Sequence, residues 1–114
     1  MTLNEFKNKL ANNAKDINFT ETISVIESMY EFTPATFTNG ELKNEASQNQ
    51  GSCKVFSFAV KQNLTKEDTL ACFGQYYFND VLEHPNATDH QNIRNFMKTG
   101  FEGLHFESEA LTEK

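Results

Sequence analysis

Five stretches of this sequence repeat apolar residues at helical spacing, and residues that favour helix ends separate them. This pattern constrains the fold more than any other feature, because each stretch has an apolar face that must be buried against another element. Phe56 and Phe58 also alternate as in a strand, but Ser52 and Asn63 on either side favour a helix there. The expected helices span residues 2–13, 20–33, 53–63, 66–84 and 89–100.

Residues with capping chemistry mark the ends of these helices. Thr2 and Glu5 have the spacing of a capping box, and Asn63 and Gly100 suit the conformations that end helices. Gly74 lies inside the fourth helix, where glycine costs about 1 kcal/mol relative to alanine, so we expect a backbone or ligand to approach it closely. The expected N-terminal caps are Thr2, Thr20, Ser52, Thr65 and either Thr88 or Asp89.

Two segments have the character of strands. Asn39 and Gly40 stand between short apolar flanks, which predicts a tight hairpin, and the alternation in residues 104–106 predicts a strand that pairs with it. The polar connection over residues 41–52 is either a solvated loop or a functional one. We therefore expect an α+β fold, a helix-rich single domain over residues 1–114 with about five helices and a small antiparallel β-sheet or hairpin.

Charge and length exclude several classes of protein. A net charge of −6 disfavours binding to nucleic acid or to an anionic membrane, and 114 residues allow one domain. No secretory signal is visible and the longest apolar run, VFSFAV, is too short to span a bilayer. We expect a cytoplasmic monomer with no cofactor, whose partner is an unidentified protein or small molecule.

Cys53 is the best candidate nucleophile in the chain. It is expected in the first turn of a helix beside Lys54, where the helix dipole and the cation would lower its pKa. A thiol-dependent hydrolase or transferase would use His90 as its base, oriented by Asp89, Asn92 or Asn49. The alternative is that Cys53 is an ordinary small buried residue.

Asp80 and His84 lie four residues apart on an expected helix and therefore share a face. With His90 they would form a carboxylate and imidazole site for zinc or iron. No HxH or HExxH pattern supports that site, so an ion pair is the favoured reading and we assign no metal.

Amide, hydroxyl and imidazole side chains gather in two segments, just before Cys53 and at the start of the helix near residue 90. His90 shares a side with apolar residues, so we expect it to be partly buried and to need a partner.

Gln75 and Tyr76 either line a pocket or form the rim of a helix. Ser52 lacks a GxSxG frame, which leaves a serine hydrolase without sequence support. The expected binding residues are Asn49, Ser52, Gln75, Tyr76, Asp89, Asn92 and Asn95.

The chain resembles the HopJ family of type III effectors of plant-pathogenic bacteria. The resemblance rests on three stretches, YEFTPATFTNGELKNEASQNQGSCKVFSFA, LACFGQYYFNDVLEHPNATDHQNIRNFMKTGF and GLHFESEAL. The family has no assigned catalytic residues, so the resemblance implies none for this chain. It does imply secretion through a type III system as the alternative to a cytoplasmic location. The sequence departs from the expected pattern at Asn63, where the family favours glycine, and at Phe78, where it favours a charged residue. Our leading hypothesis is a small binding or interaction protein.

Overall fold

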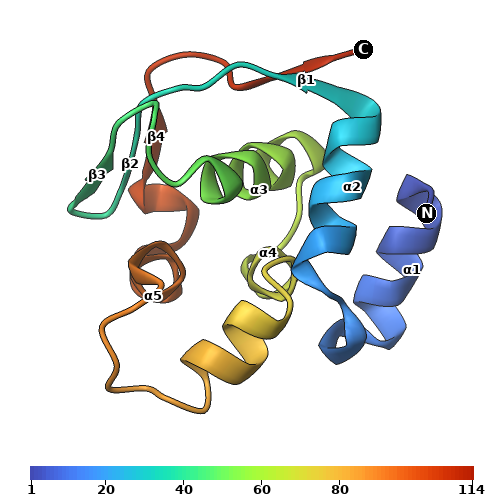
Figure 1. Ribbon diagram of the computed structural model, residues 1–114, viewed down its shortest axis with the longest axis horizontal. Coiled ribbons are helices and arrows are strands. Elements are labelled where there is room, and N and C mark those ends of the chain that lie inside the picture. Colours follow the sequence, from blue (N-terminus) through green and yellow to red (C-terminus); the bar gives the residue numbers. More distant parts are fainter.

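Helix α3 (Gln50–Gln62) lies at the centre of the molecule, and the other elements surround it (Figure 1). The computed structural model describes residues 1–114. Helices α1 and α2 lie on one side of α3, and helix α5 and the strands β2, β3 and β4 lie on the other (Figure 1). The architecture confirms a helix-rich α+β fold. The fully buried phenylalanines join these elements in one core: Phe6, Phe37, Phe56, Phe58, Phe73 and Phe96.

The N-terminal helix forms as its capping pattern predicts. Helix α1 (Leu3–Asn12) begins with a reciprocal capping box in which Thr2 Oγ1 accepts from the amide of Glu5 and Glu5 Oε1 accepts from the amide of Thr2. A short 3-10 turn, η1 (Ala14–Asp16), follows it. Phe6 and Leu10 are buried, as the apolar stripe requires.

Helix α2 (Phe19–Met29) begins earlier than predicted. The cap is Asn18 and not Thr20, because Asn18 Oδ1 accepts from the amide of Thr20 while Glu21 Oε1 accepts from the amide of Asn18. This second reciprocal capping box has the Asn-x-x-Glu form. The helix also ends earlier than Thr33, because strand β1 (Tyr30–Phe32) takes over the next residues.

Strand β1 pairs antiparallel with β5 (Leu111–Glu113), a strand that the sequence pattern did not reveal. The second sheet has the order β3-β2-β4. Strands β2 (Phe37–Asn39) and β3 (Leu42–Asn44) form the predicted hairpin, and β4 (Leu104–Phe106) pairs with β2 as predicted. The turn is Gly40–Glu41, one residue later than expected, so Asn39 is a strand residue with a buried side chain.

The two central helices begin and end differently from the prediction. Helix α3 begins at Gln50, so its first flanking residue is Asn49 and the expected cap at Ser52 is wrong. Asn63 ends the helix in the left-handed conformation with φ of 54°, which confirms the predicted end. Asparagine tolerates this region, so the departure from glycine at this position costs little.

The expected long helix over residues 66–84 is two elements, α4 (Lys66–Ala71) and the π-helix η2 (Tyr76–Val81). The break falls at Gly74, which has φ of +59°. A Cβ there would lie 2.7 Å from both the carbonyl oxygen of Ile17 and the amide nitrogen of Phe19. The predicted close approach of a backbone is therefore confirmed, and it is the reason that the helix breaks. Phe78 in η2 is half-buried against the core.

Helix α5 (Gln91–Thr99) begins after His90, which has φ of 50°, and not after a Thr88 or Asp89 cap. Gly100 ends the helix with φ of 59°, as predicted, and a 3-10 turn, η3 (Gly100–Gly103), leads into β4. None of the helices has the length and apolar character needed to cross a membrane.

Candidate functional site

A pocket of about 390 Å³ lies where helices α3 and α5 begin. Its volume falls in the range that small-molecule sites occupy, roughly 300–1,000 Å³. Both polar segments noted in the sequence contribute to its wall, although some 40 residues separate them. The lining residues are Phe19, Leu42, Asn49, Gly51, Ser52, Phe73, Tyr76, His90, Gln91, Asn92 and Ile93.

Four asparagines link the starts of the two helices beneath this pocket. Asn92 Nδ2 donates to Asn44 Oδ1 at 2.9 Å, and Asn49 Nδ2 donates to the same oxygen at 2.6 Å. In return, Asn44 Nδ2 and Asn39 Nδ2 each donate to Asn92 Oδ1 at 3.1 Å. Because Asn39, Asn44 and Asn92 are buried, each of these hydrogen bonds replaces one that water would otherwise make. The network therefore fixes the position of α3 relative to α5.

Helices α3 and α5 both begin beside the pocket, and neither has a side-chain cap. Asn49 and His90 precede them in the left-handed conformation, with φ of 49° and 50°. Asparagine and histidine are among the residues that adopt this region most readily. The first-turn amides of Gly51 and Ser52 in α3 consequently have no hydrogen-bond acceptor within the protein. By contrast, side chains cap α1, α2 and α4.

Aromatic rings form another part of the pocket lining. The ring of Phe19 packs against Tyr76 with 5.0 Å between centroids and against Phe73 at 6.2 Å. The ring of Tyr76 in turn stacks on the imidazole of His90 at 5.2 Å, with 29° between the planes. Gln75 Oε1 accepts from the amide of Phe19 at 2.9 Å, which joins η2 to the start of α2. The pocket lining thus combines aromatic rings with polar side chains.

His90 finds its partner in Asp80, which lies on η2. His90 Nε2 is 3.0 Å from Asp80 Oδ2, and the His90 side chain is 28% exposed, which confirms that it is partly buried and paired. Asp89 lies further away, at 3.9 Å, and is held by Arg94 at 2.8 Å. The hydrogen bond from Arg94 is the main cause that lowers the pKa of Asp89.

The remaining predicted binding residues lie outside the pocket wall. Gln75 accepts a hydrogen bond from the backbone amide of Phe19, and Asp89 accepts one from Arg94. Asn95 contributes its backbone carbonyl to a hydrogen bond from Thr99 Oγ1, and its side chain makes no hydrogen bond. The pocket therefore brings together Asn49, Ser52, Tyr76, His90 and Asn92 from the predicted set.

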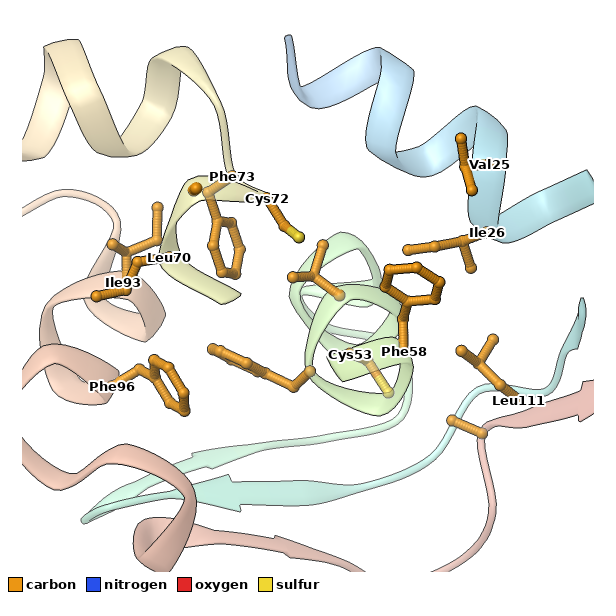
Figure 2. Packing of buried hydrophobic residues seen from close by; sticks show 14 of the residues in the cluster. Val25, Ile26, Cys53, Phe58, Leu70, Cys72, Phe73, Ile93, Phe96 and Leu111 are labelled. Atoms are coloured by element: carbon orange, nitrogen blue, oxygen red, sulfur yellow. The ribbon is translucent and has the colours of Figure 1, made fainter. Parts of the chain in front are cut away.

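Cys53 does not have the properties of a thiolate nucleophile. Helix α3 begins at Gln50, so the amide of Cys53 is already bonded to the carbonyl of Asn49 and its side chain points into the core, with 1% exposed. Figure 2 shows Cys53 and Cys72 among the buried apolar side chains. Burial raises the pKa of both thiols. The expected low pKa of Cys53 is wrong, and its sulfur contacts the carbonyl of Ala35 at 3.9 Å and does not line the pocket that holds His90.

The metal site considered at Asp80, His84 and His90 does not form. His84 is exposed, and no group of three His, Cys, Asp or Glu side chains is arranged so that it could hold a metal ion. The expected helix over residues 66–84 breaks at Gly74, and Asp80 pairs with His90 across the connection to α5. The favoured ion pair between Asp80 and His84 is therefore also wrong, because the partner of Asp80 is His90.

Sequence reasoning missed the apolar and backbone parts of the site. Phe19 and Phe73 have the appearance of ordinary core residues in the sequence, and Asn39 and Asn44 that of hairpin residues. Gly51 is also part of the site, and a Cβ at this position would lie 3.1 Å from the Phe19 ring. The excess of asparagine around the hairpin and before Gly51 was the one available pointer to a buried amide network.

These features define a helix-rich α+β domain with a polar and aromatic pocket between two helix starts. The family model for "HopJ type III effector protein" matches residues 3–111, so the chain belongs to this family. A crystal structure of VPA0580, described as a protein of unknown function, is similar over 100% of this chain and 95% of that chain, with 55% identity and a TM-score of 0.96. The comparison with curated proteins found no match.

Proposed function

We propose that this protein binds a small planar molecule with polar edges in the pocket between α3 and α5. The observation that carries the proposal is the convergence of two polar segments on one cavity with an aromatic wall. Pockets with an apolar wall and a few convergent polar groups are the usual form of small-molecule sites.

The two walls match two parts of such a ligand. The rings of Phe19 and Tyr76 are partly exposed and line the pocket, so an aromatic ring of the ligand can pack against them, and the gain for such pairs is about 0.5–1.5 kcal/mol beyond burial. The hydroxyl of Ser52 and the free amides beside it face a ligand's polar edge. Both walls are already in place, because the asparagine network and the Asp80–His90 pair hold them.

The test uses benzoate and benzamide as probes, with chemical shifts of backbone amides as the readout. We expect both probes to shift the amides of Gly51, Ser52 and Gln91 and to leave those of α1 unchanged. Ser52→Trp fills the pocket and should abolish the shifts. Ser24→Trp, at an exposed position on α2, is the matched control and should leave them intact. If neither probe shifts the pocket amides, or if Ser52→Trp leaves the shifts unchanged, the proposal is refuted.

We also propose a cytoplasmic location, with delivery through a type III system as the alternative that the family description suggests. A translocation reporter fused to the chain, in a host strain with and without a working type III system, separates the two. Reporter signal only with the working system would establish export and overturn the cytoplasmic assignment.

A further inference from the structure

We propose that the same pocket is an acyl-transfer centre in which Ser52 is the nucleophile, His90 the general base and Asp80 the residue that positions His90. The inference rests on the proposed small-molecule site and names its substrate class as small esters with a planar group. It is carried by a paired imidazole and an unbonded hydroxyl that line one cavity beside free backbone amides.

His90 is held in one orientation from three sides. Its Nε2 lies 3.0 Å from Asp80 Oδ2, its ring stacks on Tyr76, and its backbone is fixed at the start of α5. With the Asp80 carboxylate as acceptor, the proton of the neutral imidazole belongs on Nε2 and the lone pair on Nδ1. Nδ1 has no hydrogen-bond partner within the protein. The imidazole is therefore oriented by a carboxylate and keeps a basic nitrogen free, as a general base requires.

Ser52 is the nucleophilic group that shares this pocket. It is the third residue of α3 and partly exposed, and its Oγ makes no hydrogen bond within the protein. No hydrogen bond joins Ser52 to His90 in the free protein, and catalytic hydrogen bonds commonly tighten only in the complex with substrate. The free amides of Gly51 and Ser52 are donors for an oxyanion. A triad is recognised by geometry and roles, so the missing GxSxG frame does not exclude one here.

The reaction balances without a cofactor. Ser52 Oγ bonds to the acyl carbon, the ester C–O bond breaks, and the Oγ proton passes through His90 Nδ1 to the leaving alcohol. Water then adds to the acyl carbon and gives one proton to His90. The carboxylic acid leaves as the Ser52–acyl bond breaks, and that proton returns to Oγ.

Labelling with an alkyl fluorophosphonate tests the nucleophile directly. In this reaction Ser52 Oγ bonds to phosphorus, fluoride leaves, and the hydroxyl proton departs through His90. We expect mass spectrometry to place the adduct on Ser52. Ser52→Ala should abolish it, and Ser24→Ala, which removes an exposed hydroxyl on α2, should not change it. His90→Asn should slow labelling by about 100-fold or more, the usual contribution of a general base, and asparagine tolerates the left-handed backbone at this position.

The kinetics of p-nitrophenyl acetate hydrolysis test whether Asp80 positions His90 for catalysis or only stabilises the folded protein. Asp80→Asn keeps the size and an acceptor but loses the charge, so we expect kcat to fall at least about 10-fold with KM unchanged. Asp80→Glu should recover part of that loss. A merely structural role would instead alter benzoate binding or the unfolding midpoint.

The two proposals fail in different ways. Benzoate and benzamide shifts in the pocket without any adduct on Ser52 would overturn the acyl-transfer centre and leave the binding site standing. An adduct on Ser52 that forms no faster than one on Ser24 would also overturn it. Absence of both the shifts and the adduct would refute both proposals.

Discussion

Replacement of Gly74 by asparagine should destabilise the protein strongly, although asparagine tolerates the left-handed backbone that Gly74 adopts. The added Cβ would lie 2.7 Å from the carbonyl oxygen of Ile17 and from the amide nitrogen of Phe19, and 3.0 Å from the carbonyl carbon of Asn18. All three are backbone atoms, so no side-chain rotation relieves the contact. The segment after α4 must move away from the start of α2.

The expected cost combines two terms. Overpacking of a tight contact costs about 1–3 kcal/mol. Movement of the segment also breaks the hydrogen bond from the Phe19 amide to Gln75 Oε1, which contributes about 1 kcal/mol. The sum is about 2–4 kcal/mol, a large part of the roughly 5–15 kcal/mol by which domains are stable.

Urea unfolding measures this cost, and Gly40→Asn is the matched control. Gly40 also has a positive φ, +63°, but its nearest neighbour is the side chain of Thr99 at 3.3 Å, and asparagine is favoured in tight hairpin turns. With m near 2 kcal/mol/M, we expect Gly74→Asn to lower the midpoint by about 1–2 M and Gly40→Asn to leave it nearly unchanged. Equal midpoints for the two variants would show that the close approach at Gly74 does not constrain the fold.

Three further predictions concern the amide network, an ion pair and a thiol. Asn92→Ala leaves buried amide groups without partners, so it should lower the free energy of unfolding in urea by about 1–3 kcal/mol. The control Asn95→Ala should lower it by less than about 0.5 kcal/mol. Equal losses of stability in the two variants would contradict the role of the network. The Lys9 hydrogen bond lowers the pKa of Glu21 below its ordinary 4.5, so its stabilisation is present above that pH and is lost as the pH falls through the lowered pKa. Glu21→Gln should therefore flatten the loss of stability below pH 4.5, and an unchanged slope would count against the ion pair. Iodoacetamide should leave Cys53 unmodified in the native protein and modify it in urea; modification in the native state would contradict its burial.

The prediction from sequence succeeded where a few neighbouring residues decide the structure. The capping box at Thr2 and Glu5 and the left-handed end at Asn63 need only local hydrogen bonds or local backbone preference, and both were confirmed. The cap of α2 was misplaced by two residues, because the Asn18 and Glu21 pair competes with Thr20 as a capping site. Such an error stays local.

The larger errors occurred where distant segments decide the structure. The helix predicted over residues 66–84 breaks at Gly74 because the backbone of residues 17–19 crosses it. Asn49 and His90 precede their helices without a side-chain cap, because the amide network and the Asp80–His90 pair hold those starts in place. The predicted reactivity of Cys53 is wrong because α3 begins at Gln50. With that start, the Cys53 side chain lies in the core.

The sequence by itself determined a helix-rich α+β domain, the helix ends at Thr2, Asn63, Thr65 and Gly100, and the two polar segments that contain the candidate site. Those properties depend on apolar periodicity and on hydrogen bonds between residues a few positions apart. Only the tertiary structure decided that Ser52, Tyr76 and His90 share one pocket and that Asp80 is the partner of His90. The physical reason is that burial and packing set these contacts between residues distant in the chain, and no local pattern encodes their distances.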